Sequence, residues 1–331
     1  MNAQTLRNVL ISVVVGALFL FLAFRNVAFD QLGEALGRFH LGYLAPAIAI
    51  SLLLQVFRAW RWQIELQPLE RLPLSKLWVV ISVAYMAINV MPARLGEFVR
   101  PWLLSKRSRV SFSNVVGNLV LEKTIDSVVI VFYILLGLIT TANLPDWVRR
   151  GAMVPATAAV LLATLVAMMW LKGEPFVDRL IIQRLPERFA AGLRRVLRAF
   201  LDGMKILPDG RLLSAVLAIS IAYWFLPILS SWIIIRAFDF AVPFNAALIV
   251  FIFIGFGTAL PGLPGNIGTY QYACILALGL FGIDQSQALA YGLVLNAIQL
   301  VTLILQGLVA LPFAGVGFDD FRRAREEVGG G

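Results

Sequence analysis

The sequence has 331 residues, of which 60% are hydrophobic and only 14% are charged, and its mean hydropathy is +0.84. A soluble domain carries about 25% charged residues, so this composition excludes an ordinary soluble fold and indicates a chain solvated by lipid. The formal net charge is +9, but the basic residues fall between apolar runs, where they orient membrane proteins, and we therefore expect no nucleic-acid partner.

Six apolar stretches approach or exceed the roughly 20 residues that a helix needs to cross the hydrocarbon core. They cover residues 8–24, 41–57, 115–140, 152–171, 211–236 and 287–313. Only Arg7 precedes the first run and no small-residue cleavage site follows it, so we expect a retained helix rather than a cleaved signal. The sequence predicts an all-α polytopic membrane protein with one transmembrane domain over residues 1–317 and a polar tail over residues 318–331.

Two further apolar stretches, residues 76–104 and 245–282, are interrupted in the middle by proline and glycine. If both enter the membrane and turn back, and if both termini are cytoplasmic, most of the basic residues lie in cytoplasmic loops. If each stretch crossed once, the strongly basic segment 172–211 would lie outside. The positive-inside bias therefore favours two re-entrant hairpins.

The two breaks share a local pattern, Pro-x-x-x-Gly, at Pro92–Gly96 and at Pro264–Gly268. The predicted topology makes the first hairpin enter from the cytoplasm and the second from the outside. Paired elements of opposite orientation are typical of transporters built from inverted repeats. A kinked helix at each break is the alternative.

The long cytoplasmic segment at about 174–208 has apolar residues at helical spacing and arginines on its other faces. This pattern is typical of an amphipathic helix at the membrane surface. A helix that packs on the cytoplasmic ends of its neighbours has the same pattern, and both interpretations stay open.

A break at membrane depth needs a cavity lined by protein or water, because its backbone groups must be satisfied. Proline suits the first turn of a helix, so Pro92 and Pro264 would each begin a half-helix whose positive N-terminal end attracts a phosphate or carboxylate. Charged residues gather near the first break. They are Arg94, Glu97 and Arg100 in the hairpin and Glu122, Lys123 and Asp126 in the following span.

These six charges sum to zero, and each costs about 2.5–3.5 kcal/mol at the bilayer centre, so they need partners or water. Glu122 and Asp126 are four residues apart and share one helical face. Two interpretations follow: a polar cavity in which an anionic headgroup exchanges partners with ion pairs, and a structural salt-bridge network. A second basic pair, Arg58 and Arg61, stands among tryptophans and is either a membrane-interface anchor or a further headgroup site.

The polar groups of the second hairpin are mainly amides. Asn266 and Gln271 follow its glycines Gly265 and Gly268, Asn296 and Gln299 in the last span could face them, and Asn89 precedes the first break. Hydrogen bonding between helices is the ordinary role of such amides. The sequence has one cysteine and one histidine and no recognisable catalytic motif, so we expect neither a metal or other cofactor nor enzymatic activity.

Four motifs together resemble the lysylphosphatidylglycerol synthase transmembrane family over about residues 8–313. They are Arg58-x-x-Arg61-Trp62, Asn89-x-x-Pro92-x-Arg94-x-Gly96-Glu97-x-x-Arg100, Leu121-Glu122-x-x-x-Asp126 and Pro264-Gly265-x-x-Gly268. The family usually has a glutamate where this sequence has Gln271. The resemblance implies lipid translocation by a stand-alone protein that lacks the aminoacyl-transferring domain of bifunctional relatives.

We therefore expect a flippase-like or scramblase-like translocator in a bacterial inner membrane. Its substrate would be a phospholipid or another anionic, polyprenyl-type or hopanoid-type amphiphile. Membrane lipids are the expected partners, together with a lipid-modifying enzyme or further copies of the chain. The alternatives are an integral-membrane enzyme, or a subunit of one, acting on a lipid-linked phosphate or sugar, and a scaffold for a lipid-modifying partner.

Overall fold

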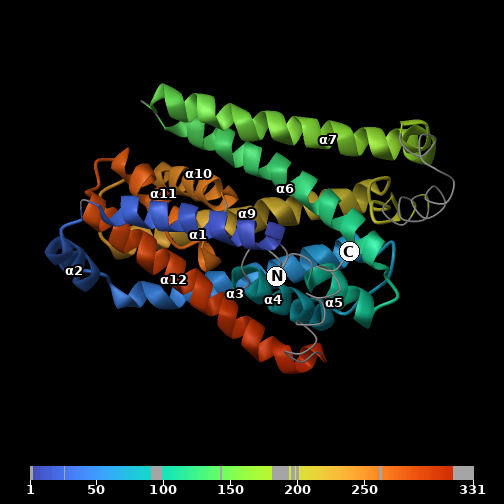
Figure 1. Ribbon diagram of the computed structural model, residues 1–331, viewed down its shortest axis with the longest axis horizontal. Helices are drawn as coiled ribbons and strands as arrows, with labels where there is room; N and C mark the ends of the chain where they lie inside the picture. The colour runs from blue at the N-terminus through green and yellow to red at the C-terminus, as the bar shows by residue number, and fades with distance from the viewer. Residues whose placement is uncertain are drawn as a thin grey trace.

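The computed structural model describes residues 3–25, 27–90, 99–141, 144–180, 201–260 and 263–315, together with Arg194 and Arg198. Within these ranges every regular element is a helix. Figure 1 shows an elongated bundle in which most of the long helices run along the long axis of the molecule. The polytopic all-α class predicted from composition is confirmed.

The long helices coincide with the predicted apolar stretches. They are α1 (Ala3–Phe24), α3 (Leu44–Leu66), α6 (Phe112–Thr140), α7 (Asp146–Leu180), α9 (Gly210–Ala237) and α12 (Gln285–Ala310). Shorter elements connect or extend them: α2 (Phe29–Gly37), η1 (Leu41–Tyr43) and η5 (Leu311–Ala314). Among the described residues, four segments are long and apolar enough to cross a membrane, and the bent pair α1–α2 makes a fifth if it counts as one span. A total of six full spans stays a prediction.

Side chains that cap helix N-termini fix where several helices begin. The Ser111 hydroxyl accepts the Asn114 N–H at 3.2 Å at the start of α6, and the Asp209 carboxylate accepts the N–H groups of Arg211 and Leu212 at the start of α9. Such caps satisfy backbone donors that have no partner inside the helix. They explain why these helices start at polar residues next to apolar runs.

The second span ends later than the sequence predicts. Helix α3 continues past residue 57 to Leu66, so Arg58 and Arg61 lie inside the helix and not in a cytoplasmic loop. The predicted end was wrong because hydropathy treats each charge as solvated, whereas Arg61 is buried against acidic partners from another helix. Interfacial anchoring by Arg61 and Trp62 is also wrong, since both side chains are buried.

Both interrupted stretches form pairs of short helices. They are α4 (Leu74–Val90) with α5 (Val99–Arg107), and α10 (Asn245–Ala259) with α11 (Thr269–Gly279). None reaches the roughly 20 residues of a spanning helix. In Figure 1 the α4–α5 pair and the α10–α11 pair lie towards opposite ends of the bundle. The first break, residues 91–98, lies outside the described residues.

At the second break the chain makes a short 3-10 turn, η4 (Pro264–Asn266), which packs against α4. Gly265 and Gly268 have φ angles of +70° and +95°, a region that side-chain-bearing residues rarely adopt. Gly268 also lies against the backbone of Gly16 in α1, where a Cβ atom would be 3.0 Å from the Leu20 nitrogen. The break is therefore a closely packed turn inside the bundle.

The C-terminal end of the predicted amphipathic segment packs on α6. Met204 and Ile206 are buried, and the Cα of Gly203 lies so close to α6 that a Cβ atom would be 2.6 Å from the Asn118 nitrogen. For this end of the segment, packing against a neighbouring helix is the correct interpretation. Most of residues 181–200 lie outside the described part of the chain.

Candidate functional site

One face of α3 carries a row of polar residues into the bundle. Arg58, Arg61, Trp62 and Glu65 recur at intervals of three or four residues, so they share a face of the helix. Arg61, Trp62 and Glu65 are buried, and Arg58 is half-buried. This face meets a matching polar face of α6, formed by Asn118, Glu122 and Asp126.

Arg61 lies at the centre of the site and binds two carboxylates of α6. Its guanidinium donates to Asp126 Oδ1 at 2.5 Å and to Glu122 Oε1 at 2.8 Å. Ser220 of α9 accepts a longer bond at 3.3 Å. The shared face predicted from the four-residue spacing of Glu122 and Asp126 is confirmed, and it joins α3 to α6.

Arg100 brings a third helix to the same carboxylate. Its Nη1 donates to Glu122 Oε1 at 3.0 Å, and its Nη2 lies 2.7 Å from Glu122 Oε2 as an ion pair. The Arg100 guanidinium also stacks over the Trp62 ring, with 4.0 Å from Cζ to the ring centroid. Helix α5, which follows the first break, is thus attached to α3 and α6 through charge.

Two indoles donate hydrogen bonds to the polar row of α6. Trp62 Nε1 donates to Asn118 Oδ1 at 2.8 Å, and Trp224 Nε1 of α9 donates to Asp126 Oδ1 at 2.8 Å. Buried polar groups are costly without partners, so these bonds stabilise the acidic face of α6 inside the bundle. We refer to Arg61, Glu65, Arg100, Glu122 and Asp126 as the charge cluster.

Glu65 is the member of the charge cluster that the sequence analysis missed. Its side chain is 0% exposed, and the nearest cationic atom is Arg61 Nε at 3.6 Å. Neither carboxylate oxygen has a hydrogen-bond partner among the described residues. Its spacing of four residues from Arg61 was the available signal, but the expected end of the helix at residue 57 placed it in a loop. With two arginines and three carboxylates, the cluster has a formal charge of −1.

Arg58 lies one helical turn from Arg61 and has different partners. It donates to the Tyr223 hydroxyl and to Gln55 Oε1, each at 2.8 Å, and stacks over the Tyr85 ring at 3.9 Å. In the described part of the chain no carboxylate lies within ion-pair distance of it. The described surroundings of Arg58 therefore solvate its positive charge with two tyrosine side chains and an amide, and they contribute no neutralising carboxylate.

Arg58 borders a cavity of about 530 Å³ in the middle of the bundle. Tyr85, Tyr223 and Trp224 line the cavity near Arg58. The walls beyond them are mostly apolar and come from α6, α7, α9 and α10, with Asn266, Tyr270 and Gln299 as polar groups from the second break and its neighbours. Arg58 is thus the cationic residue among the described lining residues, most of which are apolar.

The amides near the second break hold its backbone. Gln271 is buried, and its Oε1 accepts the Gly268 N–H at 2.7 Å, which caps α11. Asn296 of α12 donates to the Gly265 carbonyl at 3.1 Å, and Gln299 accepts from the Tyr270 hydroxyl at 3.2 Å. Gln271 thus supplies an amide oxygen as the acceptor for this backbone N–H.

The remaining predicted residues are placed as follows. Lys123 is exposed and makes no ion pair among the described residues, and the Asn89 amide donates to the Tyr85 carbonyl within α4 at 2.9 Å. Pro264 begins η4, and Asn266 has a φ of +56° and borders the cavity. Pro92, Arg94, Gly96 and Glu97 lie outside the described residues.

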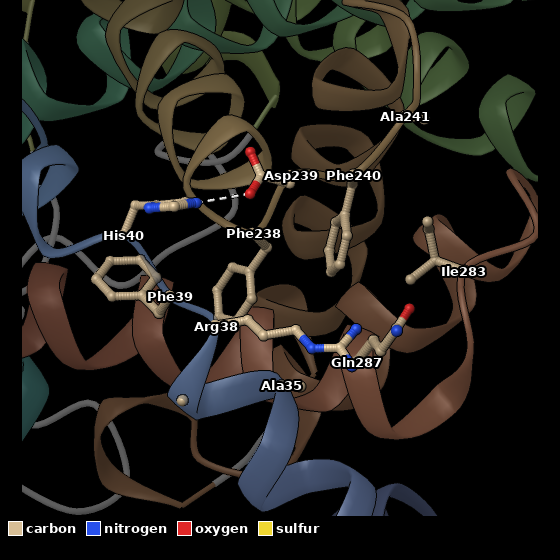
Figure 2. A pocket seen from close by; sticks show the side chains of 11 residues that line it. Ala35, Arg38, Phe39, His40, Phe238, Asp239, Phe240, Ala241, Ile283 and Gln287 are labelled. Carbon is tan, nitrogen blue, oxygen red and sulfur yellow. Dashed lines mark hydrogen bonds and ion pairs between the residues drawn. The ribbon is translucent and has the colours of Figure 1, made fainter.

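A second hollow, of about 570 Å³, lies where the connections α2–α3 and α9–α10 meet. There His40 Nε2 and Asp239 Oδ2 are 2.6 Å apart, a pairing of residues 199 positions apart that sequence spacing could not indicate. Figure 2 shows this pair on one side of the rings of Phe238 and Phe240, with Arg38 and Gln287 on the other side. Both His40 and Asp239 are largely exposed, in contrast to the charge cluster.

Comparison with known proteins agrees with the architecture and the motifs. The family described as "Lysylphosphatidylglycerol synthase TM region" matches residues 9–307. A UPF0104 membrane protein of Methanothermobacter thermautotrophicus is 22% identical over 92% of this chain and 95% of its own length. A second UPF0104 membrane protein, from Methanocaldococcus jannaschii, is 23% identical over 67% of this chain and 91% of its own length. Since the match extends over nearly the whole polytopic bundle, the chain is a multi-pass integral membrane protein that belongs to the lysylphosphatidylglycerol synthase TM region family.

Proposed function

We propose that the protein translocates an anionic amphiphile, a phospholipid or a related polyprenyl-type or hopanoid-type lipid, across the cytoplasmic membrane. The observation that carries this proposal is the position of Arg58. Among the residues that the structure describes, this guanidinium has no carboxylate partner, and it borders a mostly apolar cavity. Such a group is suited to an anionic headgroup whose acyl chains need an apolar environment.

The contrast between Arg58 and Arg61 supports this assignment. The two terminal nitrogens of Arg61 bind Glu122 and Asp126, so a phosphate that took both of them would have to displace buried carboxylates. Within the described ranges, the groups that contact Arg58 are neutral, namely Tyr223, Gln55 and the Tyr85 ring, so its charge is available to a ligand. We therefore assign headgroup contact to Arg58 and a mainly structural role to the ion pairs of Arg61 and Arg100.

The arrangement of the short helices supports a transport path. The α4–α5 and α10–α11 pairs are too short to span, they lie towards opposite ends of the bundle in Figure 1, and η4 of the second pair packs against α4 of the first. Two re-entrant hairpins that enter from opposite faces and meet inside the membrane would have this arrangement. Movement of one hairpin relative to the other would then open the cavity to alternate sides.

The family supports the class of substrate. Its description refers to the membrane region of a synthase that makes a modified phosphatidylglycerol. A membrane region associated with such an enzyme is suited to handle an anionic phospholipid or its derivative. For this chain we therefore take phosphatidylglycerol as the first probe.

The proposal is tested with purified protein in phosphatidylcholine vesicles that contain a trace of fluorescent phosphatidylglycerol. The rate at which label moves between leaflets is measured by quenching from outside. Arg58→Ala should lower this rate about tenfold or more, since a hydrogen bond to a charged group contributes about 1.5–3 kcal/mol. Arg58→Lys should retain part of the rate because it keeps the charge without the planar fork.

Arg149→Ala is the matched control, because Arg149 is an exposed arginine at the start of α7 and does not border the cavity. A rate that is the same in the wild type, in Arg58→Ala and in protein-free vesicles would refute translocation of this lipid. Mass spectrometry of the same vesicles separates the alternatives: a new lipid species would indicate an enzyme. Absence of both transport and chemistry, with copurification of a lipid-modifying protein, would indicate a scaffold.

A further inference from the structure

Glu65 is a buried acid whose surroundings do not match an ionised carboxylate. Both of its oxygens lack hydrogen bonds among the described residues. Its nearest cationic atom, Arg61 Nε, is 3.6 Å away, too far for a hydrogen bond, and the terminal nitrogens of Arg61 bind Glu122 and Asp126 instead. An ionised carboxylate without hydrogen bonds is strongly disfavoured in a site of low polarity, and protonation relieves this penalty. The geometry alone therefore favours the neutral acid.

The charges that face Glu65 lead to the same result. Its own helix contributes Arg61, α5 contributes Arg100, and α6 contributes Glu122 and Asp126. From α4 and α9, the phenols Tyr85 and Tyr223 contact Arg58. The charged residues of these two helices are Lys76 in the first turn of α4 and, near the ends of α9, Arg211 and Arg236. Helix α12, which also packs on α3, carries no charged residue. One bound proton brings the charge cluster from −1 to zero.

Glu65 is also placed to respond to a ligand at Arg58. The two residues lie seven positions apart on the same face of α3, which corresponds to about 10 Å along the helix axis. An anionic headgroup at Arg58 adds a negative charge within this distance, and charges interact strongly across a weakly polar interior. The anion therefore favours the protonated form of Glu65, and by reciprocity the proton favours binding of the anion.

We propose that Glu65 is a proton-binding site, and that its occupancy is linked to binding of an anionic lipid headgroup at Arg58. The proton binds to and leaves one carboxylate oxygen, with no other bond made or broken. Glu65 is the penultimate residue of α3, beside the connection from Gln67 to Pro73, so proton exchange requires opening of only the end of the bundle. This proposal rests on the proposed headgroup site and adds the ion that accompanies the lipid.

The test is infrared spectroscopy of the purified protein in detergent, which detects the carbonyl stretch of a neutral carboxyl group as a function of pH. A carboxyl band that is present near neutral pH and absent in Glu65→Gln is expected. Phosphatidylglycerol in the micelle should move the midpoint of this band to higher pH, whereas phosphatidylcholine should not. Arg58→Ala should abolish the lipid-dependent movement but retain the band.

Glu34→Gln is the control, because Glu34 is an exposed acid on α2 that pairs only with Arg38. It should leave the band and its midpoint unchanged. Glu65→Gln should also fold with a thermal midpoint at or above that of the wild type at neutral pH, because glutamine resembles the neutral acid in shape. An ionised Glu65 that stabilised the cluster would instead make this variant less stable.

A band at neutral pH that survives in Glu65→Gln, or a midpoint that phosphatidylglycerol does not move, would overturn the proposal. These measurements need no transport. Vesicles in which the wild type moves no lipid would therefore contradict the proposed function while leaving a linked, protonated Glu65 established. Transport by a protein that lacks the carboxyl band would support the proposed function and contradict a protonated Glu65.

Discussion

Replacement of Arg61 by alanine removes the cation on which the contact between α3 and α6 depends. The guanidinium binds Asp126 at 2.5 Å and Glu122 at 2.8 Å. Glu122 keeps its ion pair with Arg100, whereas the Trp224 indole is the hydrogen-bond partner that Asp126 retains among the described residues. One buried carboxylate is thus left without a cation, and we expect a loss of about 3–5 kcal/mol in the free energy of unfolding, the cost of breaking a buried ion pair from one side.

Reversible unfolding of the purified protein in mixed micelles, followed by far-ultraviolet circular dichroism, measures this loss. Arg150→Ala is the control, because the Arg150–Asp146 pair is exposed and its atoms are 3.9 Å apart. Exposed pairs contribute little, so the control should stay within about 0.5 kcal/mol of the wild type. The comparison of the two variants separates the effect of breaking a buried ion pair on stability from the effect of removing any arginine.

A double-mutant cycle gives the sharper test. The double variant Arg61→Ala/Asp126→Ala has no unpaired carboxylate at position 126. Its loss in the free energy of unfolding should therefore be smaller than the sum of the two single losses by about 0.5–3 kcal/mol. Additive losses, or an Arg61→Ala variant within about 1 kcal/mol of the wild type, would refute the conclusion that the charge cluster holds α3 to α6. Such a result would show that the cluster is already hydrated and contributes little to stability.

Three further predictions concern one glycine, the amide that caps α11 and a second amide. Each is measured as the thermal midpoint in detergent. Gly203→Ala should cost about 1–3 kcal/mol by overpacking against the α6 backbone, whereas Gly210→Ala, which meets no atom within 4 Å, should be neutral. Gln271→Leu should lower the midpoint because the Gly268 N–H loses its acceptor, and Gln271→Glu should restore an acceptor. Asn296→Ala should cost about 0.6 kcal/mol, the average for a hydrogen bond between membrane helices; a loss several times larger would show that the second break depends on this bond alone.

The sequence was sufficient for the class of fold and for most helices, because long apolar runs have few alternatives in a membrane. It failed at the end of α3. There, the charges of Arg58 and Arg61 looked like the boundary of a span, although the helix continues to Leu66. Hydropathy sums residues one at a time, and it contains no information about a carboxylate on another helix that compensates a buried charge.

The site was predicted only in part, because the sequence does not indicate which residues of different helices come together. Spacing within one helix identified the shared face of Glu122 and Asp126, and both carboxylates bind Arg61. The different environments of Arg58 and Arg61 depend on Tyr223 and on α6, which no local pattern connects to α3. Glu65 was missed because it fell beyond the expected end of its helix.

Two of the eight tryptophans of the chain belong to the charge cluster's immediate surroundings. Trp62 has the Arg100 guanidinium over its ring at 4.0 Å, and Trp224 donates directly to Asp126. The emission of an indole depends on the electric field across its ring and on its hydrogen bond. The protein therefore carries its own optical reporters, so that a change of charge in the cluster can be followed in the unlabelled chain, with phenylalanine at each position to assign the signal.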